Sequence, residues 1–105
     1  MSDKVYTIEE IKKMLELILK EFPVYKVILF GSYAKNSATP SSDMDFIIDT
    51  KEKLMGFKLF SLITKIEESF NKPIDAFERS EIIRNSKIDE EIKKTGVVVY
   101  EKQRI

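Results

Sequence analysis

Histidine and cysteine are both absent from this sequence of 105 residues. Without cysteine the chain has no disulfide, no catalytic thiolate and no cysteine-based metal site, which agrees with a reducing compartment. Without histidine a Ser-His-Asp triad is excluded, and zinc loses its usual ligands. Any chemistry in this chain must therefore use carboxylates, hydroxyls, amines and backbone amides.

The sequence also lacks an excess of charge of either sign and any long apolar run. Its 18 acidic and 18 basic side chains balance, so no direct nucleic-acid binding is expected. No apolar run approaches the ~20 residues needed to span a membrane, and the first residues lack the apolar core of a signal peptide. We expect a cytoplasmic protein without membrane contact.

The spacing of apolar residues predicts helices alternating with short strands in a single domain over residues 1–105. Thr7 and Glu10 form a capping-box pattern at the start of the first helix, and Pro23 prevents its continuation. In the second helix we assign the apolar stripe to the core and no chemistry to it. The expected helices cover residues 8–21, 54–70 and 86–94, and the expected strands cover 24–30, 43–49, 72–77 and 97–100.

The most informative stretch is a polar loop between two apolar runs, residues 27–30 and 46–48. Gly31 and Ser32 follow the first run directly. Glycine lets the backbone approach a ligand closely, and the amides of such a turn, with the serine hydroxyl, suit a phosphate. A short helix starting near Ser32 would add its first amides to this anion site.

Two carboxylates, Asp43 and Asp45, end the same loop. On a strand they point the same way, with their bases roughly 7 Å apart. They would repel each other unless a cation lies between them, and all-oxygen ligation suits Mg²⁺ or Mn²⁺. The structural alternative is a solvated junction in which Asp43 merely caps a turn. A phosphate cradle close to two metal-binding carboxylates describes a site for a metal-bound nucleoside triphosphate.

The pattern Gly31-Ser32, a loop and Asp43-x-Asp45 resembles the signature of the DNA polymerase beta-type nucleotidyltransferase superfamily. Residues 31–34 and 42–46 are similar to its minimal nucleotidyltransferase (MNT) branch, which includes MntA-like antitoxins. The family has a third carboxylate on a later strand, and Asp75 is the matching position. The resemblance implies an α/β (α+β) nucleotidyltransferase fold, with a small mixed sheet of about four strands and helices packed on it.

The resemblance also implies roles for individual residues. Asp43, Asp45 and Asp75 would be catalytic residues and metal ligands. Lys35 stands where many relatives have arginine, and Asn36 replaces their glycine. Lys35 keeps a positive charge, so it either reaches the triphosphate or is a solvated loop cation. Tyr33 is interpreted as structural. The expected nucleotide-binding residues are Gly31, Ser32, Lys35 and Ser42.

For function, the resemblance implies transfer of AMP from ATP to a hydroxyl, in the first place a tyrosine, of a partner HEPN-type toxin that the chain would neutralise as an antitoxin. The alternative is a non-catalytic nucleotide-binding module that neutralises its partner by complex formation. A third hypothesis is a nucleotidyltransferase for a small molecule such as an aminoglycoside, which would need an additional domain. A homodimer or a hetero-oligomer is expected, because a small open sheet leaves strand edges available for pairing.

Overall fold

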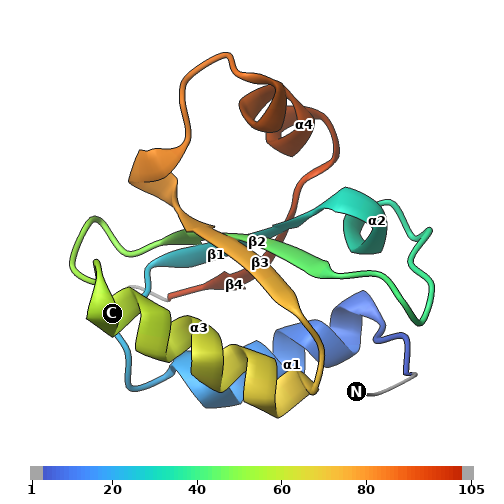
Figure 1. The fold of residues 1–105 in the computed structure, drawn as a ribbon, viewed down its shortest axis with the longest axis horizontal. Helices are drawn as coiled ribbons and strands as arrows, with labels where there is room; N and C mark the ends of the chain where they lie inside the picture. The colour runs from blue at the N-terminus through green and yellow to red at the C-terminus, as the bar shows by residue number, and fades with distance from the viewer. Residues whose placement is uncertain (1–3, 103–105) are drawn as a thin grey trace.

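A mixed sheet of four strands, in the order β3-β2-β1-β4, forms the centre of the molecule. A computed structural model describes residues 4–102 (Figure 1). Strand β1 (Lys26–Phe30) pairs antiparallel with β2 (Met44–Asp49) and with β4 (Val97–Glu101), and β3 (Ile74–Glu78) runs parallel to β2. The small mixed sheet expected from the sequence is therefore confirmed.

Helices cover both faces of this sheet. Helices α1 (Ile8–Leu19) and α3 (Phe57–Phe70) lie on one face, whereas α4 (Lys87–Thr95) and the short 3₁₀ helix η1 (Arg79–Glu81) lie on the other (Figure 1). The main core fills the space between the sheet and the first pair of helices. A smaller apolar cluster lies beneath α4, and its buried members are Phe30, Ile47 and Ile92.

The predicted capping box starts α1. The Thr7 hydroxyl accepts a hydrogen bond from the Glu10 amide at 3.1 Å, and the Glu10 carboxylate accepts one from the Thr7 amide at 2.9 Å. The reciprocal bonds satisfy two amides that a helix start leaves without partners. The helix ends at Leu19 rather than at residue 21, before Pro23.

Helix α3 begins later than the sequence predicts. Gly56 precedes it with a φ of 57°, in the left-handed region that favours glycine. Leu54 does not belong to the helix, since its amide donates to the Thr50 hydroxyl at 3.2 Å and its side chain packs into the core. The predicted apolar stripe of the helix is confirmed as core, and its fully buried members are Leu62, Ile66 and Phe70.

The remaining elements agree with the sequence within two residues at each end. Strand β3 covers 74–78 rather than 72–77. The Ser86 hydroxyl caps α4 by accepting from the Asp89 amide at 3.2 Å, and Gly96 ends that helix as predicted. Across residues 4–102, no helix combines the length and the apolar character that a membrane crossing requires.

Candidate active site

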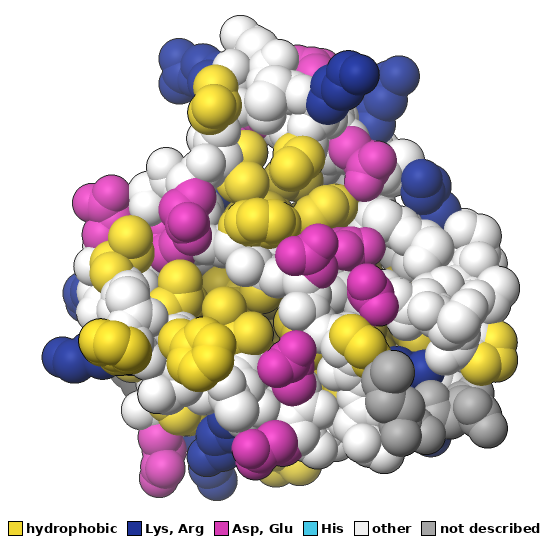
Figure 2. All heavy atoms as spheres, in the orientation of Figure 1, with side chains coloured by type: hydrophobic (Ala, Val, Ile, Leu, Met, Phe, Trp, Pro, Cys, Tyr) yellow, Lys and Arg dark blue, Asp and Glu magenta, His cyan; other side chains and the backbone are white. Residues whose placement is uncertain are grey.

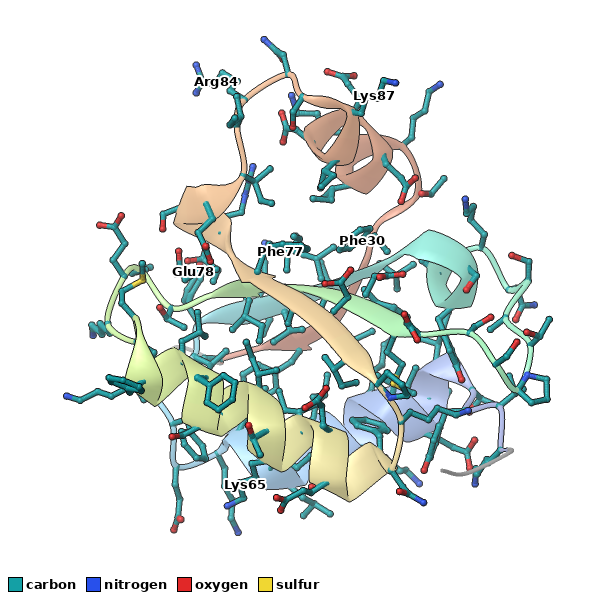
Figure 3. All side chains as sticks on the ribbon, viewed as in Figure 1. Phe30, Lys65, Phe77, Glu78, Arg84 and Lys87 are labelled. Carbon is teal, nitrogen blue, oxygen red and sulfur yellow. The ribbon has the colours of Figure 1, made fainter. Side chains whose placement is uncertain are left out.

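Asp45 and Asp75 occupy facing positions on the neighbouring strands β2 and β3. Side chains two residues apart on a strand share a face of the sheet. Ile47 and Phe77 both belong to the apolar cluster beneath α4, and Figure 3 shows Phe77 between the sheet and that helix. Asp45 and Asp75 precede them by two residues and therefore face the same side. Asp43 is exposed and lies immediately before β2.

Several acidic side chains in this region act on Asp45. Asp45 is half-buried, and its pKa is raised to about 6, first by burial and then by the negative charges of Asp75, Asp43 and Glu91. The structure thus brings the predicted carboxylates into one electrostatic cluster. Each neighbouring negative charge makes ionisation of Asp45 more costly. A bound cation would offset this repulsion, so such a cluster favours cation binding.

Glu91 is a member of this cluster that sequence reasoning missed. It lies on α4, far along the chain from the carboxylates, and its negative charge helps to raise the pKa of Asp45. In the sequence it stands in a run of charged residues typical of a solvated helix face. Its position depends on α4 packing against the sheet beside α2, which no local pattern shows.

Gly31 allows the backbone to pass directly beside the Asp45 carboxylate. Its φ is 73°, and a Cβ atom at this position would overlap Oδ2 of Asp45 and lie 3.2 Å from Cγ. A side chain is therefore excluded by both the backbone conformation and the space. Gly31 begins the short helix α2 (Gly31–Ala34), and the preceding residue, Phe30, provides no side-chain cap for its first amides.

Ser32 and Tyr33, in the same short helix, point to different environments. Ser32 is half-buried, and its carbonyl accepts hydrogen bonds from the Ser37 amide at 2.9 Å and the Ser37 hydroxyl at 3.3 Å. Both bonds use the Ser32 carbonyl and hold the loop that follows α2. Neither of them involves the Ser32 hydroxyl. Tyr33 is 3% exposed and packs in the main core, which confirms its structural interpretation.

Lys35 lines a pocket of about 430 Å³ between the end of α2 and α4. The opposite wall carries Lys87 and Lys94 together with Glu90 and Glu91. The predicted nucleotide-binding lysine is therefore close to Glu91, which itself acts on Asp45. A larger pocket of about 590 Å³, between α1 and β4, contains none of the predicted site residues.

Ser42 contributes to the turn that leads into β2. Its hydroxyl accepts a hydrogen bond from the Thr39 amide at 2.9 Å and lies 3.3 Å from the Thr39 hydroxyl. These bonds stabilise the turn between Thr39 and Ser42. Its role in nucleotide binding stays a prediction.

The donor chemistry of the carboxylates fits a hard divalent ion. Asp43, Asp45 and Asp75 supply oxygen ligands only, as Mg²⁺ and Mn²⁺ prefer. Among residues 4–102, however, no three acidic side chains are gathered closely enough to form a ready metal site. The three carboxylates lie on or beside two neighbouring strands but are not held in a preformed cage.

Asp45→Asn is expected to stabilise the metal-free chain by ~1–2 kcal/mol at neutral pH, because a raised pKa reports an unfavourable charge in the folded state. This gain should disappear below pH 3.8, where Asp45 is protonated in both the folded and the unfolded chain. Urea unfolding of both proteins at the two pH values tests this. A variant less stable than the wild type at neutral pH would contradict it.

Known proteins resemble this chain over most of its length. Residues 9–105 match the model of the family described as polymerase beta, nucleotidyltransferase. Two proteins of Methanocaldococcus jannaschii, provisionally named as the protein adenylyltransferases MJ0126 and MJ0128, are 32% identical over 80 residues and 36% identical over 73 residues. These alignments cover 72% and 66% of this chain, and 82% and 74% of the relatives.

Solved structures show the same fold. A chain from a toxin–antitoxin crystal structure with AMP-PNP superposes with a TM-score of 0.70 at 17% identity, over 93% of this chain and 76% of that chain. A chain from the complex of the tri-AMPylated Shewanella oneidensis HEPN toxin with its MNT antitoxin gives 0.68 at 13% identity, over 91% and 74%. With the family model matched from residue 9 to the end, the chain belongs to the polymerase beta nucleotidyltransferase family and is an enzyme of the nucleotidyltransferase class.

Proposed function

We propose that this chain transfers AMP from ATP to a hydroxyl group, in the first place a tyrosine, of a partner HEPN-type toxin and thereby acts as its antitoxin. The observation that carries the proposal is the position of Asp75 directly opposite Asp45, with Asp43 and the Gly31 turn beside them. The names of the Methanocaldococcus jannaschii relatives and the AMPylated toxin in a similar structure support this direction of transfer.

In the proposed reaction the acceptor hydroxyl oxygen attacks the α-phosphorus of ATP. The bond between that phosphorus and the oxygen bridging to the β-phosphate breaks, and pyrophosphate leaves. Gly31 and Ser32 bind the phosphates, and Asp75, the exposed member of the facing pair, accepts the proton from the hydroxyl or orients that oxygen. Mg²⁺ or Mn²⁺, held by Asp43, Asp45 and Asp75, would neutralise the charge of the attacking and leaving oxygens.

The proposal places the reaction in the cytoplasm and requires no nucleic acid. Lys35 is proposed to contact the phosphates, since it lines the pocket that reaches from α2 to α4. Ser42 is proposed to hold the turn before Asp43 and to contact the nucleotide from there. The chain forms a hetero-oligomer with the toxin in this account.

The test is incubation of the purified chain with α-labelled ATP, Mg²⁺ and the protein encoded next to it in its genome. The matched control is the double variant Asp43→Asn, Asp45→Asn, which removes two negative charges from the crowded acidic cluster. We expect label on the partner with the wild-type chain, and at least ~100-fold less with the variant. A stable complex without label would instead favour a binding module that neutralises its partner without chemistry.

A further inference from the structure

Lys72 is buried just before β3, the strand that carries Asp75. It is 4% exposed and precedes Asp75 by three residues. Lysine is almost never fully buried unless its ammonium is paired or hydrogen-bonded, because removing that charge from water is costly. The burial of a lysine this close to the proposed catalytic carboxylates therefore calls for a structural reason.

The ammonium of Lys72 reaches a turn that lies 32 residues earlier in the chain, where it donates a hydrogen bond to the Pro40 carbonyl at 2.9 Å. This turn is closed by a bond from the Ser42 amide to the Thr39 carbonyl at 3.0 Å. The Ser42 hydroxyl closes it a second time by accepting from the Thr39 amide. Asp43 follows the turn directly, so Lys72 holds the segment that leads into Asp43. We call the hydrogen bond from Lys72 to Pro40 the Lys72 tether.

A backbone bond holds the chain on the other side of Asp43. The Met44 amide donates to the Pro73 carbonyl at 3.2 Å. Pro73 follows Lys72, so two neighbouring residues before β3 bind the chain both before and after Asp43. Of these two contacts, only the Lys72 tether uses a side chain, and a substitution can therefore remove it while the backbone bond stays.

Asp43 depends on such a tether more than the other two proposed ligands do. Asp45 and Asp75 face each other within the paired strands β2 and β3, whereas Asp43 is exposed and lies outside the pairing. Figure 2 shows acidic side chains grouped over these strands, and the charge of Asp43 acts on Asp45. If the turn were mobile, ordering it when a cation binds would cost conformational entropy and weaken binding.

We propose that Lys72 is a positioning residue, which holds Asp43 where it can share a divalent cation with the two carboxylates of the paired strands. This inference rests on the proposed function, because it takes the three carboxylates to be ligands of Mg²⁺ or Mn²⁺. Lys72 touches neither the cation nor the nucleotide in this account. It acts through the Pro40 carbonyl, and it orders the turn before the cation arrives.

The test is titration of the purified chain with Mn²⁺, in which electron paramagnetic resonance measures the unbound ion. Lys72→Met removes the donor but keeps an apolar stem of similar length. We expect this variant to bind Mn²⁺ at least ~10-fold more weakly than the wild type, as the loss of a contact that orients a metal ligand does. Lys72→Arg keeps a cationic donor, so its binding should stay within ~3-fold of the wild-type value.

Two further variants separate positioning from a general loss of stability. Glu78→Gln is expected to destabilise the fold without removing the Lys72 tether, so it should bind Mn²⁺ like the wild type. Pro40→Gly keeps the carbonyl and the ammonium but loosens an exposed turn, and we expect ~3-fold weaker binding. If Lys72→Met does not fold, Pro40→Gly and Lys72→Arg decide the question.

Each outcome separates the positioning of Asp43 from the proposed chemistry. Weaker Mn²⁺ binding by Lys72→Met and Pro40→Gly, without AMP transfer by the wild type, would support the tether and overturn the transfer. Equal Mn²⁺ binding by all variants, with intact transfer, would overturn the tether and keep the transfer. Equal weakening in Glu78→Gln would assign the effect to stability and overturn the inference. A wild type that binds no Mn²⁺ would also overturn it, whereas labelling of the partner would still decide the transfer.

Discussion

Asp75→Asn is expected to slow AMP transfer at least ~100-fold while ATP binding stays within a few-fold of the wild-type value. Asp75 faces Asp45 across β2 and β3, and it is exposed where Asp45 is half-buried. It is therefore more accessible to an incoming hydroxyl than Asp45 is. Asn keeps the shape of the side chain but removes the charge that would accept a proton or bind a cation.

The matched control for this variant is Asp49→Asn. Asp49 lies on β2 four residues after Asp45, at the opposite end of the strand, and accepts a hydrogen bond from the Lys51 amide at 3.0 Å. An asparagine oxygen can accept the same bond, so transfer should be unchanged. Single-turnover labelling of the partner measures both rates. If Asp75→Asn kept more than ~10% of the wild-type rate, Asp75 would neither accept the proton nor bind a catalytic cation.

Glu78→Gln is expected to lower the free energy of unfolding by ~3 kcal/mol at neutral pH. The Glu78 carboxylate is 1% exposed. It accepts hydrogen bonds from the amide and hydroxyl of Thr50, both at 2.9 Å, from the Glu52 amide at 3.4 Å, and from the amide and hydroxyl of Ser80. It thereby ties the end of β3 to the loop after β2. Glutamine would place its NH₂ group, which is a donor, against some of these donor groups, and their hydrogen bonds would be lost.

The pH dependence of stability gives an independent test of how much the Glu78 carboxylate stabilises the folded chain. Burial acts to raise its pKa, but the hydrogen bonds from Ser80 and Thr50 outweigh burial and lower the pKa from 4.5 to about 2. A lowered pKa stabilises the folded chain above the unfolded-state value, and this contribution is lost as the pH falls from 4.5 toward 2. Urea unfolding across that range should show a steeper loss for the wild type than for Glu78→Gln. The exposed Glu68→Gln variant should follow the wild type, and equal slopes for all three would contradict the account.

The positions of the helices and strands, and of the loop between the two apolar runs, could be predicted from the sequence because they depend on local rules. The capping box at Thr7, the glycine that ends α4 and the apolar runs on either side of the loop each act within a few residues of the chain. Gly31 was expected to let the backbone approach a phosphate, and that role stays a prediction. The closeness of Gly31 to the Asp45 carboxylate is a contact between two segments that no local rule shows. The relation between Asp45 and Asp75 required a family resemblance, because strand pairing joins distant segments.

Features that depend on tertiary packing were not predictable from the sequence. Glu91 reaches the acidic cluster around Asp45 only because α4 packs beside α2, and Glu78 is an ordinary acidic residue until the loop after β2 closes over it. The exposure of Phe57 and Phe60 was missed for a related reason. Apolar residues on a helix predict burial, and only the position of the helix on the sheet shows which of them remain outside the core.

The most direct test of the central claim is to run the transfer reaction in parallel with ATP labelled at the α-phosphate and at the γ-phosphate. The claim is that the bond between the α- and β-phosphates breaks at the site formed by Asp43, Asp45 and Asp75. We predict that α-label appears on the HEPN partner, that γ-label appears only in released pyrophosphate, and that both depend on Mg²⁺ or Mn²⁺. Transfer of the γ-label to the partner, or no transfer of either label within a stable complex, would contradict the claim.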